Sequence, residues 1–178
     1  MKALKSILIL IVLAAVGAAG YWYYTQRLPT YGSEGTFEIT VGLLDPKTQQ
    51  AMPKTPYYLV VIKDGEVDPA FKQPLFGVTD AEGRAAKIIS RTQLNANDYV
   101  LVEKVGKGEY GKYFALLGTG NAIPLPNTKY TITGCGDIPE YKGTSNRQGY
   151  TVYYSATQAC NIKMSIDWGS TIDGLLNQ

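Results

Sequence analysis

The sequence contains no histidine and only two cysteines among its 178 residues. Without histidine the chain cannot form a Ser-His-Asp or Cys-His catalytic triad, nor a zinc, copper or non-haem iron site that uses imidazole ligands. Two thiols are also too few for a four-thiolate metal site. We therefore expect no bound metal and no cofactor, and the composition favours a non-catalytic role.

An uncharged apolar stretch occupies the N-terminus. Lys2 and Lys5 precede residues 6–24, which carry no charge. As a helix, residues 7–24 would span about 27 Å, close to the hydrocarbon thickness of a bilayer. The last four of them, Tyr-Trp-Tyr-Tyr, would form an aromatic belt at the membrane interface. The sequence favours an uncleaved transmembrane or signal-anchor helix within residues 1–27.

The alternative is a signal peptide with Val16-Gly17-Ala18 as its cleavage site, which predicts a secreted protein. An uncleaved anchor predicts a single-pass protein of the inner (plasma) membrane with its C-terminal domain in the periplasm. Beyond residue 24, 15 basic residues balance 15 acidic ones. A neutral outer domain gives no electrostatic basis for nucleic-acid binding, so we expect no nucleic-acid partner.

Cys135 and Cys160 are the only thiols of the chain. In an oxidising compartment such a pair predicts one structural disulfide. It would close a loop of about 26 residues and stabilise the fold by about 3.5 kcal/mol in the chain-entropy description. A redox-active pair is the alternative, but the sequence lacks the Cys-x-x-Cys spacing that would favour it.

Short segments with strand character follow a Pro- and Gly-containing linker at residues 28–35. Residues 37–43 alternate apolar and polar side chains, whereas residues 57–63 are apolar on both faces and predict a central strand. The other predicted strands cover residues 75–79, 85–90, 98–105, 113–117, 129–133, 148–154 and 162–168. This series predicts one all-β sandwich domain over residues 36–178, ending in a helical turn at residues 171–176.

A turn motif joins two of these predicted strands, and it consists of Gly77, Thr79, Asp80, Gly83 and Arg84. Asp80 can accept hydrogen bonds from the following amides, and Gly83 can adopt the positive φ that closes the turn. The motif therefore predicts a hairpin. A calcium site, which needs six to eight oxygens, is disfavoured because Asp80 and Glu82 supply only two carboxylates.

The order of strands and turns resembles the transthyretin-like (prealbumin-like, carboxypeptidase-regulatory-like) sandwiches of bacterial surface and secretion proteins. The Gly-x-Thr-Asp-x-x-Gly-Arg motif from Gly77 to Arg84 carries most of the resemblance, which covers residues 36–117. It implies an Ig-like or transthyretin-like sandwich, of the kind found in type VI secretion spikes and in pilus or adhesin stalks. Hydroxyisourate hydrolases of this group use catalytic histidines, so the resemblance does not imply that activity here.

Two further patterns suggest chemistry only weakly. Residues 106–113 match a phosphate-binding loop until the last position, where Tyr113 replaces the required Ser or Thr, and we interpret them as a hairpin loop. A glycosidase needs two carboxylates brought together in space. The available carboxylates are Asp98, Glu103, Asp137 and Glu140, and their spacing selects no pair.

The chain has 14 tyrosines. Tyrosine gives a large contact area at low entropic cost, and the candidate partner-binding residues are Tyr110, Tyr113, Tyr141 and Tyr150. We therefore predict a membrane-tethered module that binds a protein or another envelope component, such as a secretion-system accessory or an immunity protein. The alternatives are a structural subunit of a surface fibre, pilus or adhesin stalk, and a histidine-independent cell-wall hydrolase.

Overall fold

The computed structural model of the chain describes residues 27–63, 66–118, 123–134 and 138–169. These ranges contain twelve strands and one short 3-10 helix, η1 (Pro69–Phe71), which confirms the all-β class. No helix within them is long and apolar enough to cross a membrane. The predicted anchor at residues 7–24 and the helical turn at residues 171–176 lie outside the described residues.

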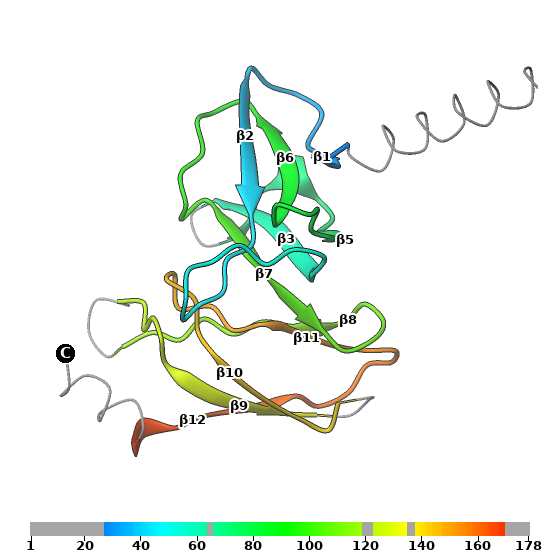
Figure 1. Ribbon diagram of the computed structural model, residues 1–178. Helices are drawn as coiled ribbons and strands as arrows, with labels where there is room; N and C mark the ends of the chain where they lie inside the picture. The colour runs from blue at the N-terminus through cyan, green and yellow to red at the C-terminus, as the bar shows by residue number, and fades with distance from the viewer. Residues whose placement is uncertain (1–26, 64–65, 119–122, 135–137, 170–178) are drawn as a thin grey trace, which may run out of the picture.

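The strands form three sheets, stacked from top to bottom in Figure 1. The N-terminal sheet has the order β1 (Thr30–Tyr31), β6 (Arg84–Ser90), β2 (Phe37–Gly42). The central sheet has the order β4 (Glu66–Val67), β3 (Pro56–Lys63), β7 (Tyr99–Val105), β11 (Tyr153–Ala156), β8 (Tyr110–Lys112), and β5 (Leu75–Val78) also pairs with β3. The C-terminal sheet has the order β10 (Glu140–Thr144), β9 (Lys129–Thr133), β12 (Lys163–Ile166).

Most predicted strands are present, but two are wrong in extent. Residues 113–117 make only isolated bridges, at Ala115 and Leu117, and the amide of Phe114 bonds to the hydroxyl of Thr151. Residues 148–152 are not a strand either, and β11 begins only at Tyr153. The sequence analysis missed β1, β4, β8 and β10, which are short or mostly polar.

Both predicted hairpins are wrong. β5 pairs with β3 in the central sheet, whereas β6 pairs with β1 and β2, so the Asp80 turn carries the chain from one sheet to another. Residues 106–109 likewise join β7 to β8, yet β11 lies between these two strands. A hairpin and a crossing between sheets need the same turn residues, and therefore the local sequence does not distinguish them.

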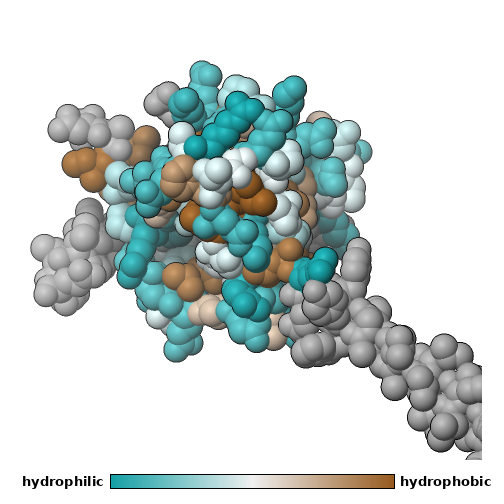
Figure 2. Space-filling model, turned by 90° about the horizontal axis from the view of Figure 1, so that it is seen from above, coloured by the Kyte–Doolittle hydropathy of each residue, from teal (hydrophilic) through white to brown (hydrophobic). Residues whose placement is uncertain are grey.

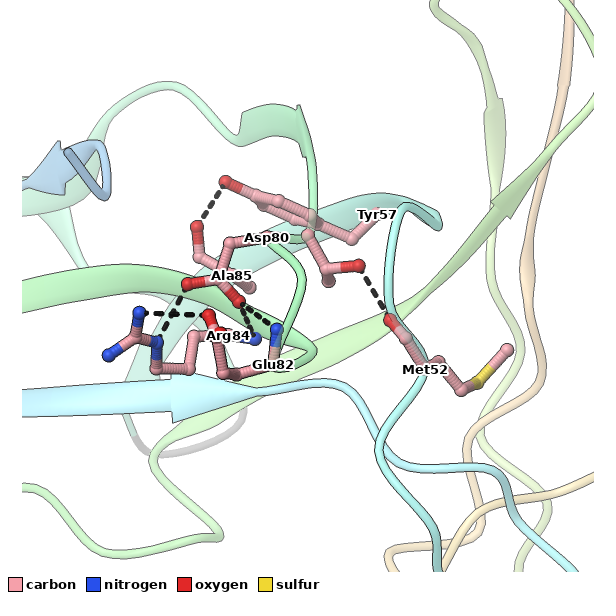
Figure 3. Close-up of polar contacts among 7 residues, drawn as sticks. Met52, Tyr57, Asp80, Glu82, Arg84 and Ala85 are labelled. Atoms are coloured by element: carbon pink, nitrogen blue, oxygen red, sulfur yellow. Dashed lines mark hydrogen bonds and ion pairs between the residues drawn. The ribbon is translucent and has the colours of Figure 1, made fainter. Parts of the chain in front are cut away.

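The local chemistry predicted for the Asp80 turn is confirmed (Figure 3). Asp80 Oδ1 accepts hydrogen bonds from the amides of Glu82 at 3.0 Å and Arg84 at 2.7 Å. Its Oδ2 accepts a hydrogen bond from Arg84 Nε at 2.7 Å. Gly83 has a φ of 78°, which side-chain-bearing residues rarely adopt. One carboxylate thus closes the turn that leads into β6.

Thr79 and Gly77 attach this turn to the central sheet. Thr79 is 3% exposed, and its hydroxyl accepts from the amide of Thr55 at 2.9 Å and donates to the carbonyl of Met52 at 2.6 Å. A Cβ on Gly77 would lie 2.5 Å from Tyr57 Oη, which donates to the carbonyl of Ala85 at 2.9 Å. The absence of a side chain at position 77 therefore makes room for a buried tyrosine.

The sheets enclose two hydrophobic cores on one face of the central sheet. The first core contains Tyr31, Val41, Leu43, Tyr57, Leu59, Val61, Phe71, Ala85, Ala86, Ile88 and Leu101. The second core contains Val105, Leu116, Tyr130, Ile132, Val152 and Tyr154. Leu101 and Val105 lie on the same face of β7 because residues two and four apart along a strand share a face. Glu103 lies between them.

Part of the expected linker belongs to the fold. Thr30 and Tyr31 form β1, which pairs in parallel with β6. Tyr31 is buried, its ring centroid lies 5.0 Å from that of Phe71, and its hydroxyl donates to the carbonyl of Gln73 at 2.8 Å. The first core therefore includes Tyr31, which the sequence analysis placed in the predicted linker.

Replacing Thr79 by valine is expected to lower the free energy of unfolding by about 1–3 kcal/mol, because the amide of Thr55 and the carbonyl of Met52 lose their partner while the side-chain volume is kept. Chemical denaturation measures the change. The matched control is Thr40→Val on the exposed side of β2, which should change stability by less than about 0.5 kcal/mol. Equal effects of the two variants would contradict the role given to Thr79.

Candidate functional site

Large apolar side chains do not gather into one exposed face in the view of Figure 2, where hydrophilic residues separate small hydrophobic patches. The exposed large hydrophobic residues of the described chain come from different elements: Phe37, Leu44, Val67, Val78, Tyr110, Leu117, Ile123 and Trp168. The described residues also contain no group of three or more side chains placed to hold a metal ion. The candidate site is instead a polar cleft.

This cleft has a volume of about 850 Å³ and lies between the N-terminal and C-terminal sheets. Residues 42–47, at the end of β2 and in the following turn, form one wall, and residues of β9 and β10 form the opposite wall. The floor consists of β7 from Tyr99 to Glu103 together with residues 146–152. Clefts of roughly 300–1,000 Å³ are typical of ligand sites.

The cleft opens where β7 loses its neighbour in the central sheet. β11 pairs with β7 only at Lys104 and Val105. The residues that precede β11 bond to residues 114–116 and not to β7. The amide of Leu116 donates to the carbonyl of Gly149 at 2.8 Å, and the amide of Thr151 donates to the carbonyl of Phe114 at 3.0 Å. Within the described ranges, no strand therefore lies beside this edge of β7 before Lys104.

Glu103 is the acidic group of the floor. Its side chain is half-buried between the two cores, and burial raises the pKa of its carboxyl group. A hydrogen bond with Tyr141 opposes this rise in pKa, and the nearby Asp45 charge adds to it. Glu103 takes part in none of the ion pairs found between described residues. Among the described residues, no cation therefore pairs with this partly desolvated carboxylate.

The charge pattern reverses at the rim. Four exposed basic residues line the outer part of the cleft: Lys47, Lys129, Lys142 and Arg147. Of these, Lys142 pairs with Glu140 at 2.8 Å. Asp45 lies in the wall, where hydrogen bonds from the Thr48 and Lys47 amides hold its pKa below the ordinary value. The cleft is therefore negative at its floor, and its exposed lining carries these four basic residues together with the acidic Asp167.

Two of the four tyrosines named from the sequence lie at the cleft. Tyr141, on β10, lines it beside Glu103, and burial is the main cause that raises the pKa of its hydroxyl. Tyr150 also lines it and packs edge-on against Tyr113, with the ring centroids 5.5 Å apart. Tyr113 packs toward Tyr58 on the opposite face of the central sheet. Tyr110 is 60% exposed on β8 and does not line the cleft.

Of the four carboxylates named from the sequence, the cleft contains only Glu103. Asp98 Oδ2 accepts a hydrogen bond from the amide of Asn95 at 2.7 Å, just before β7. Glu140 bonds to Lys142, and Asp137 lies outside the described residues. The sequence analysis did not name Asp45 as a site residue. The Asp45-Pro46 pair is typical of a turn, and this explained the presence of the aspartate.

The predicted disulfide stays a prediction. Cys135 lies outside the described residues, and the described part of the chain contains no free cysteine.

Comparison of the chain with protein-family models, with curated proteins and with solved structures found no match in any of the three.

The substitution Glu103→Gln is expected to raise the free energy of unfolding at pH 7. Burial raises the pKa of Glu103 in the folded protein, so ionisation costs more there than in the unfolded chain, and glutamine avoids that cost. Below the ordinary glutamate pKa both states of the natural protein are protonated, and the gain should disappear. Denaturation curves at several pH values measure it.

The matched control is Glu66→Gln on β4, where the side chain is exposed. It should show no comparable gain at any pH. A gain from Glu103→Gln that is as large at pH 3 as at pH 7 would contradict the effect attributed to burial.

Proposed function

We propose that the protein is a non-catalytic binding module of the cell envelope and that the cleft receives a segment of a protein partner. The observation that carries this proposal is the half-buried Glu103 carboxylate, which faces a cleft of about 850 Å³ and has no cation bound to it among the described residues. Buried charges are normally paired, and a bound partner would supply the missing group.

Tyr141 and Tyr150 support a binding role for the same cleft. Both are half-buried: the Tyr141 ring packs toward Tyr130 in the second core, whereas the Tyr150 ring packs on Tyr113 toward the opposite face of the central sheet. Tyrosines of this kind contribute contact area with little loss of side-chain entropy. The cleft thus combines fixed aromatic surface with a few charged groups, which is typical of recognition sites.

The location in the envelope is part of the proposal and rests on the sequence. Lys2 and Lys5, the uncharged residues 6–24 and the aromatic residues at their end support an anchor with the following domain outside the cytoplasm. The Gly77–Arg84 motif supports a transthyretin-like sandwich, and through it a role as a secretion-system accessory or an immunity protein.

Photo-crosslinking in intact cells tests the proposal. A benzoylphenylalanine residue placed at Lys142, on the rim of the cleft, should form an adduct with a protein partner, whereas the same residue at Tyr110 should not. The purified partner should then bind the full-length chain at least tenfold more weakly after Tyr141→Ala, and with unchanged affinity after Tyr110→Ala. Thermal unfolding of both variants establishes that they fold.

An adduct from Tyr110 and none from Lys142 would contradict binding in the cleft. Tyr110 lies on β8, an edge strand of the central sheet whose three residues are all exposed. Crosslinks between copies of this chain at that edge would favour the fibre subunit, since strands at sheet edges pair with further strands.

A glycoside hydrolase is a second candidate, and one observation favours it. Glu103 and Asp45 line the same cleft, and their pKa values move in opposite directions, as in the acid and base of glycosidases. Binding is the stronger candidate because Asp45 Oδ1 already accepts three hydrogen bonds from Lys47 and Thr48, as a turn residue does. Release of reducing ends from purified peptidoglycan, abolished by Glu103→Gln, would establish the hydrolase.

A further inference from the structure

The proposed binding role does not yet say which groups of the partner would contact Glu103 and the edge of β7 beside it. The amide of Ile62 donates to the carbonyl of Asp98 at 2.9 Å, which identifies these two residues as a hydrogen-bonded pair of the antiparallel β3–β7 ladder. Such pairs alternate along a ladder. The backbone groups of Leu101 and Tyr99 therefore point away from β3, toward the side where no described strand pairs with them before Lys104.

We propose that the cleft binds an extended segment of the partner that places a lysine or arginine side chain against Glu103, with acidic residues of the same segment at the basic rim. This inference rests on the proposed function and specifies the chemistry of the partner. The open backbone groups of β7 would hold the segment, and Glu103 would select its basic residue.

The carboxylate determines the sign of the group that enters. Glu103 is partly desolvated, and Asp45 in the wall places a second negative charge near it. A Coulomb interaction in such a site is about four times stronger than in bulk water, taking an effective dielectric constant of about 20. A basic side chain also has an apolar stem that can pack along Tyr141 while its charged end reaches the carboxylate.

The basic residues at the rim do not remove the preference of the floor for a basic side chain. Lys47, Lys129 and Arg147 are exposed to solvent, so salt and water weaken their interaction with a ligand. They disfavour a segment that is basic throughout, and they favour acidic residues outside the floor. The charge order of the cleft therefore fits a single basic residue flanked by acidic ones.

The open edge of β7 favours a peptide over a small amine. Strand addition uses main-chain hydrogen bonds for affinity and alternate side chains for specificity. Opposite charges that face one another across paired strands stabilise the pair by roughly 0.2–1 kcal/mol. A segment lying beside Leu101 would be close enough to Glu103 for its basic side chain to make this contact on the same face of the sheet.

Two blocked peptides test the inference with the full-length chain purified in a neutral detergent. The first is acetyl-Glu-Val-Lys-Val-Glu-amide, and the second replaces lysine by norleucine, which keeps the stem and removes the charge. Isothermal titration or NMR titration up to about 10 mM should detect the lysine peptide, with the norleucine peptide at least tenfold weaker.

Glu103→Gln should weaken the lysine peptide at least tenfold, and the exposed control Glu66→Gln should leave its affinity unchanged. Denaturation curves of the Glu103→Gln variant would establish independently that it folds. Equal affinity of the two peptides, equal affinity of the natural protein and Glu103→Gln, or no binding of either peptide at about 10 mM would each overturn the inference.

Failure of this inference is distinguishable from failure of the proposed function. If the partner crosslinks at Lys142 and loses affinity on Tyr141→Ala, yet binds Glu103→Gln as it binds the natural protein, the cleft is the binding site and the basic residue is not its specificity group.

Discussion

Strand β7 contributes to the two hydrophobic cores on one face of the central sheet, and the rest of the structure depends on how it is shared between them. Leu101 packs into the first core and Val105 into the second, while β3 follows one edge of the strand and β11 reaches only its end. Residues two apart on a strand face the same side. A single position, Glu103, therefore faces the seam between the cores, and the departure of β11 leaves that seam open.

Two of the acidic residues of the cleft, Asp45 and Glu103, show how position decides the character of a carboxylate. Asp45 accepts hydrogen bonds from its own turn, which stabilise its charged form, whereas Glu103 lies between apolar cores, where burial disfavours the charged form. Asp45 helps to hold the local fold, and Glu103 carries a cost in stability. Groups held at such a cost in clefts are common at functional sites.

The sequence predicts strands well where hydrophobicity alone decides them. β9 has the predicted bounds, and β3 is a central strand as its continuous apolar run indicates. Strand pairing was not predictable, because the turn after Asp80 suits a hairpin and a crossing between sheets equally. Tyr141 was named from its local context, but Glu103 was only one of four carboxylates, since its position depends on pairings between residues far apart in the sequence.

The placement of β11 also has a consequence for the order in which the molecule assembles. Ser155 Oγ donates to the carbonyl of Val105, a residue 50 positions earlier in the chain. Closing so long a loop costs entropy before any contact repays it. The first core involves only residues up to 101 and does not need this closure. A nascent chain can therefore bury its first core while β7 still lacks β11, and the cleft acquires its second wall only after β9 and β10 have been synthesised.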